Sequence, residues 1–365
     1  MGMRLGVAGV LLVLSVLFCF RDEIPLLFHS EQPDIVVIGA ALIDFLAEPH
    51  AEELLLKTSN PGVIHRSWGG VSRNIAHSVS ISLPELHSTA TTRSIFFISV
   101  VGDDLFGKSF YEEHRRFDTS GVQQLPGHTG LYLAVSEGTK WNNDMHTAIS
   151  EVDILSKLSP SYISQYEQVI SHSKLIAIDA NLSIEAMKYL SSLCKGKVEI
   201  WFEPTSVPKS VRIFEAGIDL STITYISPNV VELKAMAEFS KRQQAEIPAL
   251  DIDSSDDLFY EKQNVWILLN SGIKYVITTL GPKGTLLGYL EEENELQSVT
   301  MEHFPAPPAD VIQVNGAGDA MAGCCISSLI TGRSVHESIE IGHLCAKLQL
   351  EGKPLSELQQ LLTTQ

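Results

Sequence analysis

The sequence contains few cysteines and few basic residues. Five cysteines occur among 365 residues, and no two of them have the CxxC spacing typical of a metal or redox site. Cys324 and Cys325 lie in an apolar helical stretch, where we expect thiols that fill the core of a protein from a reducing compartment, the cytoplasm. Lysine and arginine number 26 against 44 aspartates and glutamates, and the net charge of −18 disfavours nucleic acid and anionic membranes as partners.

Several common functional signatures are also missing. No GxGxxG motif opens the first strand pattern, which disfavours an ordinary dinucleotide-binding protein. No GxSxG elbow is present, and the twelve histidines do not cluster at metal-ligand spacing. The sequence therefore disfavours a serine hydrolase and a histidine-ligated metalloenzyme.

Residues 5–20 form an almost unbroken apolar run between Arg4 and Arg21. The run is shorter than the about 20 residues of a membrane span, and it has the length and flanks of a signal-peptide core or a short anchor. The chemistry expected downstream does not suit a secretory compartment, so we interpret residues 1–31 as a non-catalytic extension. Membrane contact is expected only if this run acts as an anchor, and organellar targeting is an alternative.

From residue 32 onward, apolar strand patterns alternate with helical patterns. Buried strands are expected at residues 34–39, 95–101, 175–178, 198–202, 223–226 and 275–279. Helices are expected at about 185–193, 231–239 and 258–272. This alternation predicts an α/β fold in which a mainly parallel sheet is covered by helices on both faces. Short alternating strands within about 42–70 and 127–145 predict a small additional sheet.

The stretch from residue 311 to 330 predicts an anion-binding site. An apolar run of strand type at 311–314 leads into Gly316-Ala317-Gly318-Asp319, and small and apolar residues follow at helical spacing. Glycines allow a sharp turn, and the start of a helix presents N–H groups and a positive dipole end to an anion such as phosphate. We interpret Asp319 as a base for a hydroxyl that attacks phosphorus. The competing interpretation is an ordinary acidic residue in the first turn of a helix.

Five motifs occur in an order that resembles the ribokinase (PfkB) family of sugar and nucleoside kinases. They are Gly69-Gly70-x-x-x-Asn74-x-Ala76, Val101-Gly102-x-Asp104-x-x-Gly107, Ser227-Pro228-Asn229-x-x-Glu232, Thr279-x-Gly281-x-x-Gly284 and Gly316-Ala317-Gly318-Asp319. The resemblance extends over residues 34–350. It implies a kinase domain at 32–365 with a ribokinase-like three-layer sandwich, and a β lid made by the segments within about 42–70 and 127–145.

Within this family, residues 69–76 and the Asn-Asn-Asp-Met stretch at 142–145 look most like those of pseudouridine kinases. The resemblance therefore implies an enzyme that transfers the γ-phosphoryl group of MgATP to the 5′-hydroxyl of pseudouridine. Two alternatives stay open: a kinase of another nucleoside or sugar, and a catalytically weak member that binds a nucleoside or nucleotide.

The resemblance also implies roles for individual residues. Contacts with the nucleoside are implied for Asp44, Gly69, Gly70, Asn74, Asn143, Asp144 and Asn181. Asp319 would be the base, and the N–H groups of Gly316, Ala317 and Gly318 would stabilise charge on the transferring phosphoryl group. A helix residue that caps its own turn is the alternative for Asn74, and an exposed turn is the alternative for residues 143 and 144.

On the ATP side, the resemblance implies that Thr279, Gly281 and Gly284 line the nucleotide site. Asn229 and Glu232 would organise Mg²⁺ and its waters, and a helix cap followed by a first-turn acid is the alternative for this pair. Gln313 replaces an aspartate that helps many relatives to bind a monovalent cation, so potassium dependence stays open.

The resemblance bears on assembly as well. Relatives often dimerise through the lid, so a homodimer is expected here if the outer face of the lid is apolar. The segment 136–141 looks shorter than the lid hairpin of relatives. A short lid would leave the site more open to water.

Overall fold

The computed structural model describes residues 32–51, 53–86, 94–136, 145–244, 246–250, 252–293 and 296–363. The apolar run at 5–20 lies outside this part of the chain, as do Asn143 and Asp144. Within the described ranges, no helix combines the length and the apolar character needed to cross a membrane.

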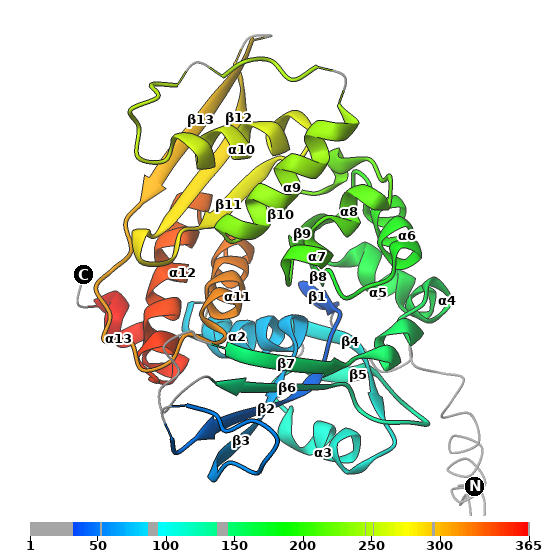
Figure 1. Cartoon of the computed structure of the whole chain (residues 1–365). Helices are drawn as coiled ribbons and strands as arrows, with labels where there is room; N and C mark the ends of the chain where they lie inside the picture. Colours follow the sequence, from blue (N-terminus) through cyan, green and yellow to red (C-terminus); the bar gives the residue numbers. More distant parts are fainter. Residues whose placement is uncertain are drawn as a thin grey trace, which may run out of the picture. The chain divides into compact units, whose positions relative to one another are not determined.

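A nine-stranded sheet forms the centre of the described chain (Figure 1). Its strands are β1 (Ile35–Ile38), β4 (Ile95–Gly102), β5 (Asp118–Leu125), β8 (Leu175–Asp179), β9 (Glu199–Glu203), β10 (Tyr225–Ile226), β11 (Tyr275–Thr279), β12 (Thr285–Glu293) and β13 (Leu296–Phe304). The order is β13-β12-β11-β10-β9-β8-β1-β4-β5. Only β11–β12 and β12–β13 pair antiparallel. The predicted mainly parallel sheet is confirmed, with an antiparallel hairpin added at one edge.

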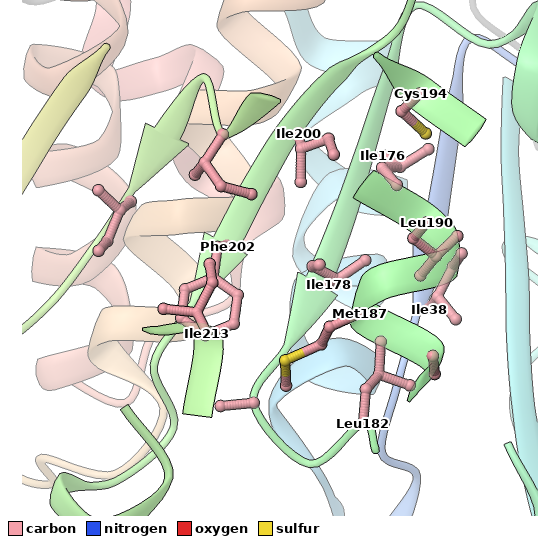
Figure 2. Packing of buried hydrophobic residues seen from close by; sticks show 14 of the residues in the cluster. Ile38, Ile176, Ile178, Leu182, Met187, Leu190, Cys194, Ile200, Phe202 and Ile213 are labelled. Carbon is pink, nitrogen blue, oxygen red and sulfur yellow. The ribbon is translucent and has the colours of Figure 1, made fainter. Parts of the chain in front are cut away.

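Helices cover both faces of this sheet, because its buried strands direct alternate side chains into two apolar cores. In β1, Val36 and Ile38 enter one core, and Ile35 and Val37 enter the other. The first core is closed by α4 (Pro160–Ile163), α5 (Glu167–His172), α6 (Ile184–Cys194), α8 (Arg212–Glu215), α9 (Val230–Gln243) and α10 (Phe259–Asn270). Figure 2 shows part of this core, with Ile38 of β1 and Ile176 of β8 beside Leu190 of α6.

The second core is closed by α2 (Val71–Leu86), α3 (Leu105–Glu113), α11 (Ala317–Ile330) and α12 (Val335–Leu350). The shorter helical elements are α7 (Val207–Ser210), α13 (Leu358–Thr363), η2 (Asp153–Lys157), η3 (Ser164–Tyr166), η4 (Leu220–Thr222), η5 (Gly281–Lys283) and η6 (Leu355–Glu357). Helix, sheet and helix thus form the three layers that the sequence predicted.

A separate four-stranded sheet lies beside this sandwich, and we call it the small sheet (Figure 1). It consists of β3 (Gly62–Gly69), β2 (Leu42–Pro49), β6 (Leu131–Ser136) and β7 (Met145–Glu151), in the order β3-β2-β6-β7. The strands β2 and β6 run parallel, and the two outer pairs run antiparallel. The predicted small additional sheet is therefore present.

Two sequence-based expectations about the end of the chain are wrong. Residues 311–314 do not form a strand; instead the N–H groups of Ile312 and Gln313 donate to the Leu350 carbonyl at the end of α12, at 2.8 and 3.1 Å. Cys324 is not an unpaired thiol, because its sulfur is bonded to that of Cys345, which joins α11 to α12. Cys325 does fill the core as a buried free thiol. The disulfide removes the argument for a reducing compartment.

Helices α2 and α11 pack closely along small side chains. A Cβ at Gly323 of α11 would lie 2.6 Å from the Ser78 Cβ and 3.0 Å from the Ile75 carbonyl oxygen of α2. One turn further on, the hydroxyls of Ser82 and Ser327 are 2.7 Å apart. The two helices that carry Asn74 and Asp319 are therefore held at a distance that only small residues allow.

We predict that Gly323→Ala destabilises the protein, although alanine is the better helix former. The added methyl group would overlap Ser78, and overpacking of this kind costs about 1–3 kcal/mol. The free energy of unfolding in urea measures the effect. Ser328→Ala on the same helix is the control: the buried Ser328 hydroxyl has no hydrogen-bond partner among the described residues, so its loss should not lower stability. An equal or higher stability for Gly323→Ala would contradict the prediction.

Candidate active site

The first turn of α11 forms the centre of the candidate site. Gly316, the residue before the helix, has φ 76°, a left-handed conformation that favours glycine. A Cβ added at Gly318 would meet no heavy atom within 4 Å, so the space beside this turn is open. The N–H groups at the start of a helix have no intrahelical acceptor, and the helix dipole adds positive potential. This turn therefore has the properties of an anion site.

Asp319 lies in that turn and is held by a residue from α2. The side-chain amide of Asn74 donates from Nδ2 to Asp319 Oδ2 at 2.7 Å. Burial raises the pKa of Asp319 to about 6, and the negative charge of Asp179 adds to this shift; the Asn74 hydrogen bond and the Arg73 charge oppose it. Asn74 thus contacts the carboxylate rather than capping its own turn. A carboxyl group that titrates near neutrality suits a general base.

Asp44 of β2 brings a second carboxylate from the small sheet. Burial raises its pKa to about 6, with Asp319 adding to the shift and Arg73 opposing it. Two glycines make room at this end of β3: a Cβ at Gly69 would overlap the Asp44 carboxylate, and a Cβ at Gly70 would overlap the Ala40 carbonyl. Gly70 also has φ 92°, which favours glycine. The structure therefore places Asp44, Gly69, Gly70 and Asn74 in one neighbourhood.

A fully buried carboxylate, Asp179 at the end of β8, ties three elements of the site together. Its Oδ2 accepts from the N–H groups of Ala40, after β1, and Ser72, in the first turn of α2, at 2.9 and 3.1 Å. Its Oδ1 accepts from the Asn181 N–H at 2.9 Å. Asn181 in turn accepts from the Lys209 ammonium at 2.5 Å, so its side-chain oxygen is directed at α7 and its NH₂ group remains for other partners.

Glu203, at the end of β9, adds another acidic group. Burial raises its pKa well above the usual range, the negative charges of Asp319 and Glu232 add to this, and a hydrogen bond from the Ser227 hydroxyl opposes it. Burial also raises the pKa of Glu232, with a contribution from Asp319. The charge of Asp319 thus acts on both Glu203 and Glu232, and the charge of Glu232 acts on Glu203.

Asn229 and Glu232 form a capping box at the start of α9. The Asn229 side-chain oxygen accepts from the N–H groups of Val231 and Glu232, both at 2.9 Å, and Glu232 Oε2 accepts from the Asn229 N–H at 3.0 Å. The helix-cap alternative is thus realised in this structure. Within the described residues, no group of three or more His, Cys, Asp or Glu side chains is arranged to hold a metal ion. Glu203 and the second oxygen of Glu232 nevertheless suit a hydrated Mg²⁺, because a divalent cation would relieve the repulsion among these carboxylates.

The residues predicted for the ATP side lie next to this cap. Thr279, the last residue of β11, bridges to Asn229, and its N–H donates to the Pro228 carbonyl at 3.0 Å. Gly281 has φ 60°, and a Cβ there would meet nothing within 4 Å. Gly284 has φ 97° and approaches the Phe304 carbonyl too closely for a side chain. Gly281 therefore leaves open space beside the turn that follows β11, and Gly284 lets this turn pack against the backbone at Phe304.

A stretch at the end of β4 has the spacing of a phosphate-binding P-loop but a different structure. Residues 102–109 read Gly-Asp-Asp-Leu-Phe-Gly-Lys-Ser. The Asp104 carboxylate caps α3 by accepting from the Gly107 N–H at 2.9 Å, and it also accepts from the Thr129 hydroxyl and N–H. A carboxylate thus occupies the position that a phosphate takes in a P-loop. The segment therefore joins the end of β4 to α3 and, through Asp104, to Thr129.

The model of the pfkB family of carbohydrate kinases matches residues 32–357. The chain belongs to this family. The protein is therefore a kinase.

Among proteins of similar sequence, pseudouridine kinase from Arabidopsis thaliana is 28% identical over 356 residues, which cover 87% of this kinase and 90% of the relative. Pseudouridine kinase from Escherichia coli (strain K12) is 26% identical and covers 88% and 91%. Among solved structures, Arabidopsis thaliana ribokinase complexed with ribose and ATP has a TM-score of 0.70 at 17% identity and covers 92% of this chain and 98% of its own. The structural similarity supports the ribokinase-like fold.

We predict that ionisation of Asp319 destabilises the folded kinase. Its folded pKa of about 6 exceeds the usual 3.8, so the folded state holds the proton more tightly, and stability is lost as the pH rises through this interval. Asp319→Asn cannot ionise. Between pH 4 and pH 7, wild type should therefore lose up to about 3 kcal/mol relative to Asp319→Asn. Urea unfolding at several pH values measures the difference, and parallel curves for the two proteins would contradict the prediction.

Proposed function

We propose that this kinase transfers the γ-phosphoryl group of MgATP to the 5′-hydroxyl of pseudouridine. The observation that carries the chemistry is Asp319, a carboxylate with a pKa near neutrality at the N-terminus of α11. The substrate is supported by the similarity to the two pseudouridine kinases and by the match of residues 69–76 to such enzymes.

In the proposed reaction, Asp319 accepts the proton of the 5′-hydroxyl as its oxygen attacks phosphorus. The N–H groups of Gly316 and Gly318 face the charge that develops on the transferring group, and the Ala317 N–H, now 3.5 Å from the Val314 carbonyl oxygen, would turn to the same charge. Asp44, Gly69, Gly70 and Asn74 hold the ribose, and Asn181 contributes from the end of β8. Asp44 accepts from the hydroxyls of a diol, and the second N–H of the Asn74 amide donates to one.

The nucleotide is proposed to lie along Thr279, Gly281 and Gly284, where two glycines keep side chains away from the turn. Mg²⁺ would be held through water by Glu232 and Glu203, and when bound it neutralises phosphate charge. Asn229 contributes by fixing Glu232 through the capping box. Gln313 donates its side-chain amide to the Gln349 carbonyl at 3.0 Å and carries no carboxylate for a monovalent cation.

A kinase of another nucleoside is the second candidate. Guanosine-inosine kinase from Exiguobacterium acetylicum is 25% identical over 84% of this chain and 91% of its own length. The two candidates share Asp319 and the ribose contacts, and they differ only in the base that is accepted.

We expect a protein that starts at Gln32 to release ADP from MgATP with pseudouridine. The other acceptors in the assay are uridine, guanosine, inosine, adenosine and ribose. Asp319→Asn should lower kcat by about 10²- to 10⁴-fold while the Kd for pseudouridine changes little, because the base acts on the reacting hydroxyl. Turnover confined to a different acceptor would replace the proposed substrate. Full activity of Asp319→Asn would contradict the assignment of the base.

We also propose that the small sheet acts as a lid and that its outer face joins two copies of this kinase. In the strand register, Phe45, Leu133 and Ile149 lie in one row on the face opposite to Asp44, and Phe45 at one end of the row packs against Phe106 of α3. Ile64 lies on the same face as this row. Ile149 is 68% exposed and Ile64 is 65% exposed, so an apolar surface is left uncovered.

Ile149→Asp should shift the kinase from dimer to monomer, since a charge in an apolar contact is not solvated. Gel filtration or light scattering at two protein concentrations measures the state. Tyr260→Asp on α10 is the control, because this side chain is 74% exposed but lies outside the small sheet. A wild-type protein that is monomeric at both concentrations would refute the proposal.

A further inference from the structure

Arg73 lies next to Asn74 on α2 and makes three hydrogen bonds without touching the anion site. Its Nη1 donates to the Trp68 carbonyl at 3.0 Å and to Asn74 Oδ1 at 2.8 Å, and its Nε donates to His114 Nε2 at 2.8 Å. A guanidinium group has donors only, so the Asn74 oxygen must face Arg73. The Asn74 NH₂ group must then face Asp319.

This arrangement fixes which end of the Asn74 amide meets the base. The opposite orientation would place the amide oxygen against the Asp319 carboxylate and the NH₂ group against the Arg73 guanidinium. Both contacts would be repulsive, and both polar groups would lose a partner. Without Arg73, the amide could rotate, and Asp319 would lose the donor that holds its Oδ2.

His114, at the C-terminal end of α3, fixes the orientation of the Arg73 guanidinium by offering it a hydrogen-bond acceptor. Its Nδ1 lies 2.8 Å from the Phe110 carbonyl oxygen, which can only accept, so Nδ1 carries the proton and Nε2 is free to accept from Arg73. The ring is 3% exposed and stacks on the Phe110 ring with centroids 4.2 Å apart. Burial and the Arg73 charge lower the pKa of His114 to about 4, so the neutral form persists at physiological pH.

We infer that Arg73 and His114 are positioning residues for catalysis: through one continuous chain of hydrogen bonds from α3, they orient the Asn74 amide and thereby hold Asp319. The chain runs from the Phe110 carbonyl through His114, Arg73 and Asn74 to Asp319. Arg73 donates in both directions: to His114, which donates to the Phe110 carbonyl, and to Asn74, which donates to Asp319. The inference rests on the proposed role of Asp319 as the base and not on the identity of the nucleoside.

The charges around Arg73 give the inference a second observable consequence. Asp44, Glu113 and Asp319 face Arg73, and His77, His114 and Arg116 are the further titratable groups nearby. The Arg73 charge lowers the pKa of both Asp319 and Asp44. Replacing Arg73 removes this charge and also frees the Asn74 amide to rotate. Both changes should raise the pKa of Asp319, by about one unit in total.

The test compares His114→Phe, His114→Gln and Arg73→Gln with wild type. Phenylalanine keeps the ring but offers no acceptor, whereas a glutamine oxygen can reach the position of Nε2. We expect His114→Phe to lower kcat about tenfold with the KM for MgATP unchanged, and His114→Gln to recover most of that loss. Arg73→Gln should lower kcat about 100-fold and move the acidic limb of the pH profile upward. Arg333→Gln is the control, because Arg333 bonds to Thr331 beyond the far end of α11.

A second measurement does not need a nucleoside. The difference in unfolding free energy between wild type and Asp319→Asn, measured against pH, follows the titration of Asp319. The same difference is then measured between Arg73→Gln and the double variant Arg73→Gln/Asp319→Asn. We expect the pH at the midpoint of the titration to be higher in this second comparison. If wild type phosphorylates none of the acceptors, the proposed function is refuted. The midpoint of the titration would still show whether Arg73 acts on Asp319. An unmoved midpoint, an unchanged kcat in Arg73→Gln, or a His114→Gln variant as impaired as His114→Phe would overturn it.

Discussion

The geometry of the site depends on the buried carboxylate of Asp179. It is completely removed from solvent and accepts backbone N–H groups from the chain after β1, from the start of α2 and from the turn after β8. A buried carboxylate is costly unless it is hydrogen-bonded, so these three segments are held together by the need to satisfy it. A Cβ at Gly39 would overlap this carboxylate and the Ser72 hydroxyl. The start of α2, and with it Arg73 and Asn74, is placed by this interaction.

Four acidic side chains gather in the candidate site. Asp44, Glu203, Glu232 and Asp319 all have pKa values raised by burial, and the acids also act on one another. The whole chain carries a net charge of −18, so no long-range field attracts ATP. Under the proposed function, binding of phosphate therefore depends on local groups: the N–H groups of the α11 turn and a divalent cation that satisfies the carboxylates.

Much of the fold could be predicted because the signals are local. Buried strands alternate with helices, and glycine motifs mark the ends of β11 and the start of α11. The antiparallel strands β12 and β13 are an addition that the alternation does not reveal. The apolar residues 311–314 have the composition of a strand, but their N–H groups find partners at the end of α12 instead of in a sheet.

The site was predictable only in part, for a similar reason. Motifs identify Asn74 and Asp319, but the sequence does not show that their side chains meet, since 245 residues separate them. The sequence does indicate Asp179 and Glu203 as site residues, because each is an acid at the end of a buried strand. No sequence pattern indicates Arg73 and His114. Their hydrogen bond depends on how the end of α3 packs against α2. The pairing of Cys324 with Cys345 likewise depends on the packing of two helices.

That disulfide makes α11 and α12 a covalently closed hairpin. The strap from Ile312 to Asn315 is bonded to Gln349 and Leu350 at the end of α12, and Asp319 lies at the start of α11, so both lie at the same end of the hairpin. On α11 the disulfide is made by Cys324, which lies about one and a half helical turns after Asp319. The disulfide and these hydrogen bonds therefore tie the strap and the start of α11, with Asp319, to one crosslinked pair of helices, whereas Asp44 belongs to the separate small sheet.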